Sequence, residues 1–251
     1  MKFLFIPSMN KIKFHIGCSS YATASWKNLF YPEDLPKKKW FEFYCRHFNT
    51  YEFNGSFYKF PTEENLLAWY DKAPENFLFS VKIPRIITHY KKLKNGETEI
   101  AQFYEVCKNG LKEKLACVLW QFPPSFDFSE DKLGLVIDAM NPDFKNVIEF
   151  RHKSWWNPEV TKVLSQRGLI FCSVNFPNLP TDIVQTSPTA YVRMHGNPEL
   201  FYSQYTIEEL ETLFKNLTSP DFEELYVYFN NTASTAGIIN AIQMTQIHDD
   251  P

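Results

Sequence analysis

Residues 116–124 read ACVLWQFPP, an almost continuous apolar run that two prolines end. A strand that is covered on both faces has this composition, and such strands occur in parallel sheets packed between helices. The segments 146–150 (NVIEF) and 169–174 (LIFCSV) have the same character. The three runs together predict a parallel α/β fold.

Strand and helix patterns alternate along the whole chain on both sides of this run. The expected strands are 14–18, 50–54, 77–83, 116–122, 146–150, 169–174, 191–195 and 225–229, and the expected helices are 37–47, 61–70, 97–113, 129–140, 157–168, 206–217 and one that opens at Ser234 or Thr235. About eight alternations without a linker or repeat are typical of one TIM-like (β/α)8 barrel, which takes about 250 residues. We assign residues 13–251 to this domain and residues 1–12 to an N-terminal extension, in which Met9 could be the native start.

The barrel is expected to be irregular at its sixth unit. Pro177, Pro180 and Pro188 interrupt the segment between Asn175 and Ala190, so the sixth helix is missing or reduced. A doubly wound open sheet is the alternative fold. That fold predicts a glycine-rich phosphate loop after the first strand, and neither GxGxxG nor GxxxxGK occurs in the sequence.

Composition narrows the class of protein. A net charge of −3 and a pI near 6.1 argue against broad electrostatic binding of nucleic acid but are compatible with a local basic pocket. The five cysteines are scattered without a CxxC pair, which predicts neither disulfides nor structural zinc and fits the reducing cytoplasm. No apolar run approaches the ~18 residues of a membrane span, so we expect no membrane association.

Chemically active side chains follow the strand at 146–150. The stretch 146–156 reads NVIEFRHKSWW, which places Glu149, Arg151, His152 and Trp155 where that strand leaves the core. In a parallel barrel the carboxyl ends of all strands meet at one face, and active sites lie on that face. The sequence therefore predicts a site at the carboxyl ends of the strands.

Two carboxylates could work together in this site. Glu149 on the fifth strand and Glu52 on the second could converge as a pair for acid/base or glycosyl-transfer chemistry. The alternative is that an arginine holds each carboxylate in a buried structural ion pair, with Arg151 or Arg193 as the partner of Glu149. Both alternatives require a partner for a charge at this depth.

Two histidines extend the prediction. His152 and His195, with Glu149 or Glu52, could relay protons or bind a divalent metal, because imidazole and carboxylate are common ligands. No HxH or HExxH spacing supports a metal, so we predict no cofactor, and a hydrogen-bonded histidine is the simpler interpretation. For His89, in a polar loop, we expect a position on the surface.

Further candidates for binding an anion lie near the ends of other strands. They are Lys82 and Arg85 at the third strand, Asn175 at the sixth, Arg193 on the seventh, and Asn230 and Asn231 after the eighth. Many barrels bind phosphate after strands seven and eight, against the N–H groups of a helix N-terminus. Alternatively, the paired asparagines only shape a turn and cap the helix.

Aromatic residues are unusually frequent, with 24 Phe, 13 Tyr and 6 Trp. Rings near strand ends could stack on a sugar or a base; they are Tyr21, Trp26, Phe57, Tyr58, Phe126, Trp155 and Tyr202. Each ring alone is more simply explained by packing. Cys18 at the first strand end could be a nucleophile, although a buried small apolar role is the default for such a cysteine.

Ordered motifs across almost the whole chain resemble one family. They are IGCS (16–19), WK (26–27), FYP (30–32), FNT (48–50), FY (57–58), VKIPR (81–85), TH (88–89), QFPPSF (121–126), EFRH (149–152), SW (154–155), YVRMHG (191–196), YFNN (228–231) and NA (240–241). The chain resembles the bacterial and archaeal family called domain of unknown function 72, or YecE-like. The resemblance implies a TIM-like barrel and no particular reaction.

This sequence departs from the family pattern at three places. Ser20 and Tyr21 stand where Gly-Trp is common, and Asn175 and Thr232 stand where the family often has aspartates. Two carboxylates are therefore absent. A mechanism that depends on those two acids is not expected in this chain.

Two functional hypotheses follow. The first is an enzyme of the hydrolase or proton-transfer type that acts on a small anionic ligand with a ring, such as a sugar phosphate or nucleotide. Glu149 would be the general acid or base with Glu52 as its counterpart, and Arg151 and Arg193 would hold negative charge. The second is a protein that binds a nucleotide or a nucleic-acid end in the same pocket without catalysis.

Overall fold

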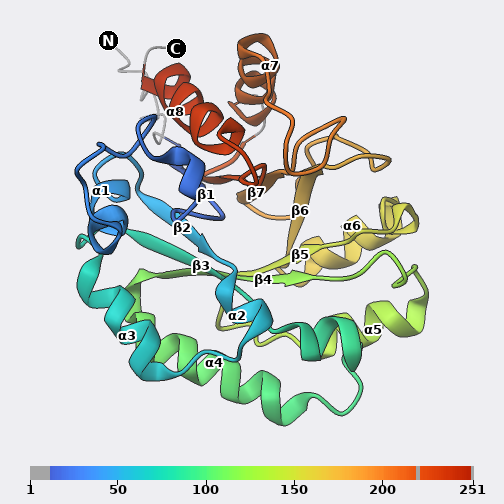
Figure 1. Ribbon diagram of the computed structural model, residues 1–251. Coiled ribbons are helices and arrows are strands. Elements are labelled where there is room, and N and C mark those ends of the chain that lie inside the picture. The colour runs from blue at the N-terminus through green and yellow to red at the C-terminus, as the bar shows by residue number, and fades with distance from the viewer. Residues whose placement is uncertain (1–11, 219–220, 250–251) are drawn as a thin grey trace, which may run out of the picture.

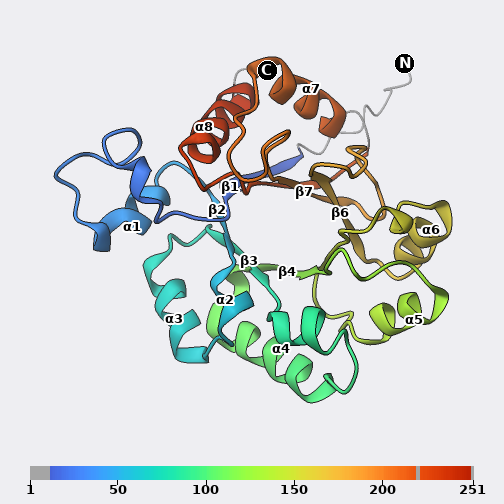
Figure 2. The same cartoon turned by 45° about the vertical axis from the view of Figure 1, so that its right-hand side comes forward.

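The structure is a computed structural model that describes residues 12–218 and 221–249, and these residues form eight parallel strands (Figure 1). The strands are β1 Lys13–Cys18, β2 Thr50–Phe53, β3 Leu78–Lys82, β4 Leu115–Gln121, β5 Asn146–Glu149, β6 Ile170–Asn175, β7 Thr189–Met194 and β8 Glu224–Phe229. They pair in the order β1-β8-β7-β6-β5-β4-β3-β2 and curve into a nearly closed barrel (Figure 2). The expected TIM-like barrel is confirmed.

Helices surround the barrel on its outside (Figure 2). The α-helices are α1 Trp40–Tyr44, α2 Gly55–Tyr58, α3 Glu63–Lys72, α4 Glu97–Leu111, α5 Glu130–Asp138, α6 Pro158–Gln166, α7 Ile207–Thr218 and α8 Ala236–Asp249, and the shorter turns are η1 Ala24–Trp26, η2 Lys37–Lys39, η3 Ile86–Tyr90, η4 Lys112–Lys114 and η5 Lys153–Trp155. None of the described helices is long and apolar enough to cross a membrane. Residues 1–11, and with them Met9 and all but Ile12 of the expected extension, lie outside the described residues.

Local sequence signals explain where several helices begin. Thr62, Ser129 and Asn157 each accept a backbone N–H from the first turn of the helix that follows, as N-cap residues do. Thr206 and Glu209 form a reciprocal capping box at the start of α7. The expected helix 37–47 is divided into η2 and α1. It also ends early, at Tyr44, because the N–H groups of Arg46 and His47 bond to carbonyls three residues back, as in a turn.

Side chains close the barrel where no backbone ladder joins β1 to β2 within the described residues. The Tyr44 hydroxyl accepts the N–H of Cys18 at 2.7 Å and donates to the carbonyl of Thr50 at 3.0 Å. A Cβ at Gly17 would lie 2.3 Å from that carbonyl oxygen, so only glycine allows the two strands to approach this closely. The tyrosine hydroxyl thus replaces a backbone hydrogen bond.

The connection between β6 and β7, residues 176–188, contains no helix, as its prolines predicted. Side-chain hydrogen bonds in both directions hold the connection against β6. Thr186 Oγ1 accepts the N–H of Phe171 at 2.9 Å, and Ser173 Oγ accepts that of Val184 at 2.9 Å. The barrel wall is therefore thinner at this side.

Most aromatic side chains pack in the core, as the composition suggested. Trp26, Trp40, Trp120 and Trp155 are fully buried. Inside the barrel, Leu119, Val147, Ile170, Cys172, Tyr191, Tyr226 and Tyr228 are among the residues of a second apolar cluster. These side chains fill the barrel interior, so the barrel is a packed core and not a pore.

Candidate functional site

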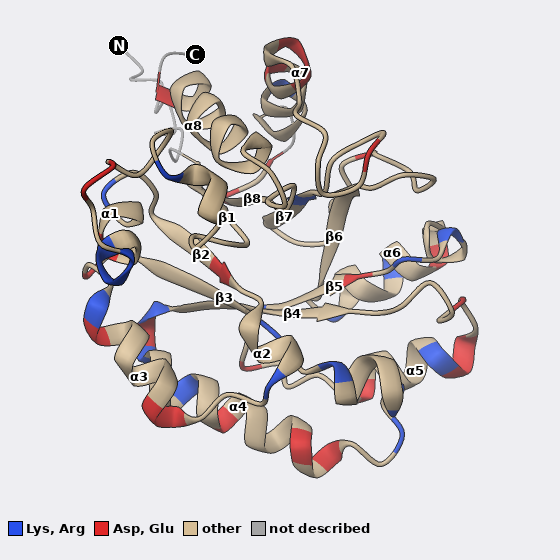
Figure 3. Ribbon diagram, viewed as in Figure 1, with Lys and Arg blue, Asp and Glu red and all other residues tan. Residues whose placement is uncertain are grey.

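Charged residues lie mostly on the outer helices and loops, and only a few lie on the strands (Figure 3). Lys13 and Glu224 begin β1 and β8 at the amino end of the barrel. The other charged residues on the described strands lie near the carboxyl ends: Glu52 on β2, Lys82 at the end of β3, Glu149 at the end of β5 and Arg193 on β7. In a barrel these ends converge on one face. The fold thus gathers residues that are far apart in the sequence.

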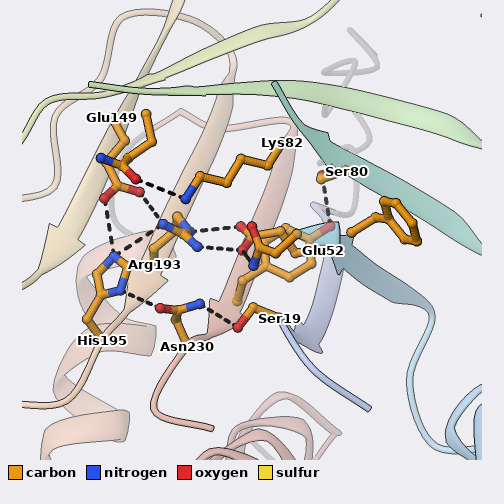
Figure 4. Close-up of polar contacts among 12 residues, drawn as sticks. Ser19, Glu52, Ser80, Lys82, Glu149, Arg193, His195 and Asn230 are labelled. Atoms are coloured by element: carbon orange, nitrogen blue, oxygen red, sulfur yellow. Dashed lines mark hydrogen bonds and ion pairs between the residues drawn. The ribbon is translucent and has the colours of Figure 1, made fainter. Parts of the chain in front are cut away.

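Arg193 joins the two carboxylates in one buried cluster (Figure 4). Its Nε and Nη2 donate to Glu52 at 2.8 and 2.6 Å, and its Nη1 donates to Glu149. Tyr191 also donates its hydroxyl to Glu52, at 2.8 Å. Glu52 and Glu149 are 0% exposed and Arg193 is 1% exposed. The two carboxylates converge as expected, and the structural ion pairs of the alternative interpretation are present.

Glu149 is also paired with Arg151, whose Nε donates to it. Burial alone would raise the pKa of the Glu149 carboxyl, but Arg151 and Arg193 outweigh burial and hold this pKa well below its ordinary value. Arg151 is itself held against the ring of Phe176, with its guanidinium carbon 3.9 Å from the ring centre. Glu149 is thus an ionised counter-ion at neutral pH.

His195 lies between the arginines and is fully buried. Its Nε2 is 3.2 Å from Arg151 Nη2, and its Nδ1 is 2.8 Å from Asn230 Oδ1. Burial, together with the charge of Arg151, lowers the pKa of His195 to about 4. The geometry therefore fits a neutral ring whose Nδ1 donates to Asn230 and whose Nε2 accepts from Arg151. Nε2 also lies 3.4 Å from Glu149 Oε1.

A cavity of about 680 Å³ opens above the cluster. Its charged lining consists of Lys82, Arg85, Arg151 and Arg193, and no carboxylate belongs to the described residues that line it. Most of its other lining side chains are polar or aromatic, including Ser19, Asn54, Phe57, Tyr58, His89, Tyr90, Gln121, Tyr202, Asn230 and Thr232. The carboxylates lie beneath the cations, so the surface offered to a ligand is positive.

Lys82 is the one lysine among the described residues that line this cavity, and it is 8% exposed. Its Nζ donates to Gln121 Oε1 at 2.9 Å and lies 4.0 Å from the centre of the Phe57 ring. Burial, reinforced by the nearby charge of Arg193, lowers the pKa of Lys82 to about 7. A large fraction of the amine is consequently neutral near pH 7.

The expected surface position of His89 is wrong. The chain after Pro84 forms the π-helical turn η3, and His89 on it is half-buried and lines the cavity. Its Nε2 lies 3.4 Å from Gln121 Nε2, and burial together with Lys82 lowers the pKa of His89 to about 4. The polarity of its surroundings misled the prediction, because the loop folds over the strand ends.

The two predicted indoles face the core. Trp26 donates its Nε1 to the carbonyl of Ser234 at 2.9 Å, and Trp155 donates to that of Phe126 at 2.7 Å. The Trp155 ring stacks on Phe150 with 3.9 Å between centres. Neither indole lines the cavity, whereas the predicted rings Tyr58 and Tyr202 do.

Three predicted polar residues also lie apart from the cavity. His152 turns its Nδ1 to Ser154 Oγ at 2.7 Å and caps η5. Asn175 accepts the hydroxyl of Tyr205 at 3.0 Å and lines a separate cavity of about 330 Å³ beside α7. Asn231 is fully buried and donates to a backbone carbonyl at 2.9 Å, so it anchors a turn, as the simpler interpretation had it.

Two glycine N–H groups after β7 and β8, where many barrels bind phosphate, have partners within the protein. Gly196 donates to the Tyr205 hydroxyl at 2.8 Å, and Gly237 in the first turn of α8 donates to the carbonyl of Asn231 at 3.0 Å. The positive charge of the cavity comes instead from side chains at β3, β5 and β7.

Two further kinds of site that the sequence raised are a metal site and a reactive thiol at Cys18. Across the described residues, no group of three or more His, Cys, Asp or Glu side chains is arranged to hold a metal ion. Cys18 is fully buried, and burial raises the pKa of its thiol, so the default role as a small apolar residue holds.

Sequence comparison assigns the family. A model of the family described as protein of unknown function DUF72 matches residues 15–250. The chain belongs to the DUF72 family. It is similar to UPF0759 protein YunF of Bacillus subtilis, with 25% identity over 87% of this chain and 90% of that protein. It is similar to UPF0759 protein YecE of Escherichia coli K12, with 27% identity over 53% of this chain and 49% of that protein.

Solved DUF72 structures share the fold. A DUF72 family protein of Thermotoga maritima aligns with a TM-score of 0.86 and 28% identity, covering 95% of this chain and all of that one (100%). A DUF72 family protein of Enterococcus faecalis aligns with a TM-score of 0.81 and 21% identity, covering 95% of this chain and 96% of that one. The nearly closed barrel is thus an architecture that this chain shares with its family.

Proposed function

We propose that the cavity binds a small anionic molecule that carries a ring, such as a sugar phosphate or nucleotide, and that the protein is an enzyme of the proton-transfer type. The observation that carries this proposal is the cationic lining without a carboxylate. Glu52 and Glu149 are both ion-paired to Arg193, and Glu149 also to Arg151, so two negative charges are balanced by two positive charges. Arg85, together with the protonated fraction of Lys82, is left to attract an anion.

Exposed rings at the mouth support a ligand that carries a ring. Tyr58 is 71% exposed, Tyr90 64% and Tyr202 53%. The guanidinium carbon of Arg85 lies 5.6 Å from the Tyr58 ring centre and 5.5 Å from that of Tyr90. A cation between two rings suits a molecule with an anionic group next to a flat ring.

The burial of the acids changes the roles that the sequence suggested. A general base must be able to take up a proton at the working pH, and the arginines keep Glu149 ionised. We therefore assign Glu149 and Glu52 to positioning Arg151 and Arg193. Proton transfer falls to Lys82, whose pKa of about 7 lets it gain and lose a proton near neutral pH. His89 and His195, with pKa values lowered to about 4, stay neutral there and can serve as hydrogen-bond partners of the ligand or of Arg151.

The same pairing favours a second candidate, binding of a nucleotide or nucleic-acid end without chemistry. Both acids already have arginine partners, so the cavity has no free acid. The net charge of −3 favours a short ligand over a long polyanion.

Thermal unfolding with added ligands tests the proposal, because a ligand that binds only the native state raises Tm by mass action. We expect ribose 5-phosphate or AMP to raise Tm and adenosine, which lacks the phosphate, to do so much less. Arg85→Met should reduce the shift, and Arg167→Met, an exposed arginine on the far end of α6, should not. Equal shifts in wild type and Arg85→Met would refute the site, and binding without turnover would favour the second candidate.

A further inference from the structure

Lys82 differs from the other buried lysine of the described residues. Lys114 is 5% exposed, and its Nζ donates to the carbonyls of Tyr70 and Ala73 at 2.8 and 2.9 Å. Lys82 has one neutral acceptor, Gln121, and forms no ion pair with any described carboxylate. Its side chain extends from β3 toward Arg193 and Glu149 in Figure 4 and lines the cavity. It is an amine without a fixed counter-ion beside a binding site.

The groups that face Lys82 keep much of it unprotonated. Arg193 from β7 and Arg151 after β5 oppose protonation, while Glu149 from β5 and Glu52 from β2 favour it. Burial is the largest effect, and the pKa of Lys82 falls to about 7. His89 on η3 faces Lys82 as well and is held neutral, with its pKa lowered to about 4.

Fixed cations around Lys82 can take the anionic part of a ligand. Arg85 and Arg151 line the same cavity and are charged at all working pH values. The hydrogen bond to Gln121 uses one N–H of the amine, which leaves the nitrogen lone pair for a carbon electrophile. A buried, uncharged lysine amine of this kind is the usual nucleophile toward carbonyl groups.

We propose that Lys82 forms an imine with an aldehyde or ketone that also carries a phosphate or similar anionic group. The amine lone pair attacks the carbonyl carbon, a C–N bond forms, and one amine proton moves to the oxygen. The second amine proton leaves with that oxygen as water when the C=N bond forms. No oxidant or reductant is needed. The inference rests on the proposed anion site and names the substrate class as a phosphorylated carbonyl compound.

Trapping the imine tests this assignment. Pyridoxal 5′-phosphate, a phosphorylated aldehyde with a ring, is mixed with the full chain and cyanoborohydride, and the reduced adduct is located by peptide mass spectrometry. We expect Lys82 to react first, and AMP, which has no carbonyl group, to protect it. Pyridoxal, which lacks the phosphate, should label Lys82 roughly tenfold more slowly, since a charge-assisted hydrogen bond contributes about 1.5 kcal/mol.

The pH profile provides a readout that does not depend on a variant. Labelling of Lys82 should be half-maximal near pH 7, whereas exposed lysines become reactive only toward their ordinary pKa of about 10.4. Lys82→Met should abolish the early-reacting adduct and leave the slow surface labelling. If that variant fails to fold, Lys82→Arg serves, because it keeps the charge and removes the nucleophile.

The possible results distinguish a failure of the imine assignment from a failure of the proposed anion site. If AMP stabilises the protein but adducts spread over surface lysines and spare Lys82, the imine is refuted and the proposed function stands. If Lys82 reacts equally with both aldehydes and AMP gives no protection, the phosphorylated substrate class and the anion site are both refuted.

Discussion

The two ends of the barrel treat charge in opposite ways. At the amino end, Glu224 is partly exposed and pairs with Lys145, whose side chain is 48% exposed, and with His15 at 3.3 Å. A cavity of about 380 Å³ there is lined by Lys145 together with Glu113, Asp143 and Glu224. At the carboxyl end, the acids are fully buried beneath the cations, and only cations among the charged residues reach the cavity.

The two ends differ in the depth of their acids, because the carboxyl end buries them beneath the cations and the amino end places them beside a cation at the opening. Acids and cations side by side at an opening cancel each other for any ligand. Acids placed below the cations still hold the guanidinium groups in position, while the opening stays positive. Burying these charges costs several kcal/mol for each ion, which partners must offset. We therefore expect that removing a charged partner lowers the free energy of unfolding strongly at the carboxyl end and only slightly at the amino end.

Removing Arg193 should have the largest effect. Arg193→Met leaves Glu52 without its cation and Glu149 with one fewer, so we expect the free energy of unfolding at pH 7 to fall by about 3 to 5 kcal/mol. Lys145→Met at the amino end should cost only about 0 to 1 kcal/mol, because the Lys145 side chain is 48% exposed and solvent screens its interaction with Glu224. Urea unfolding of the two variants measures both values. Similar losses in the two variants would show that the ends do not differ.

Removing His195 should flatten part of the pH dependence of stability. The folded pKa of about 4 lies below the ordinary 6.5, so the unfolded chain takes up this proton first. The neutral His195 therefore contributes fully to the free energy of unfolding above pH 6.5. The protein loses about 3 kcal/mol of that free energy as the pH falls from 6.5 toward 4, because the group is fully buried. His195→Gln should lose correspondingly less stability over that range in urea unfolding at stepped pH. Parallel curves for wild type and variant would contradict the neutral state of His195.

Strands and helix starts could be predicted because their causes are local. The expected helices 129–140 and 157–168 begin at the N-cap residues Ser129 and Asn157, and the connection with prolines after β6 contains no helix. The meeting of Glu52 with Glu149 could also be predicted, because a barrel brings strand ends together. These features depend on neighbours in the sequence or on the topology.

Side-chain direction depended on tertiary packing and could not be predicted. Trp155 follows a strand end as an active-site residue would, yet it turns inward to stack on Phe150. The pairing of Glu52 with Arg193 joins residues 141 positions apart, and no local signal marks it. Gln121 escaped prediction because a neutral amide at a strand end resembles any polar residue. His89 was misplaced because the π-helical turn that redirects it has no evident sequence signal.

Removing one ring at the mouth should weaken ligand binding without affecting stability. Tyr58→Ala should lower the affinity for AMP by about 1 to 2 kcal/mol, since a ring stacked on a base contributes that much. Its free energy of unfolding should change by less than about 0.5 kcal/mol, because the side chain is mostly exposed. Calorimetric titration measures the affinity, and Tyr70→Ala outside the cavity is the matched control. Equal affinity for AMP in Tyr58→Ala and Tyr70→Ala would show that the Tyr58 ring does not take part in binding.

Locating a bound phosphate group would decide between the two ends of the barrel. Crystals of the full chain soaked with AMP or ribose 5-phosphate should show the phosphate at the carboxyl end, within hydrogen-bond distance of Arg85, Arg151 or Lys82. A phosphate bound beside Lys145 at the amino end, or no phosphate in the cationic cavity at saturating ligand, would contradict the assignment of this cavity as an anion-binding site.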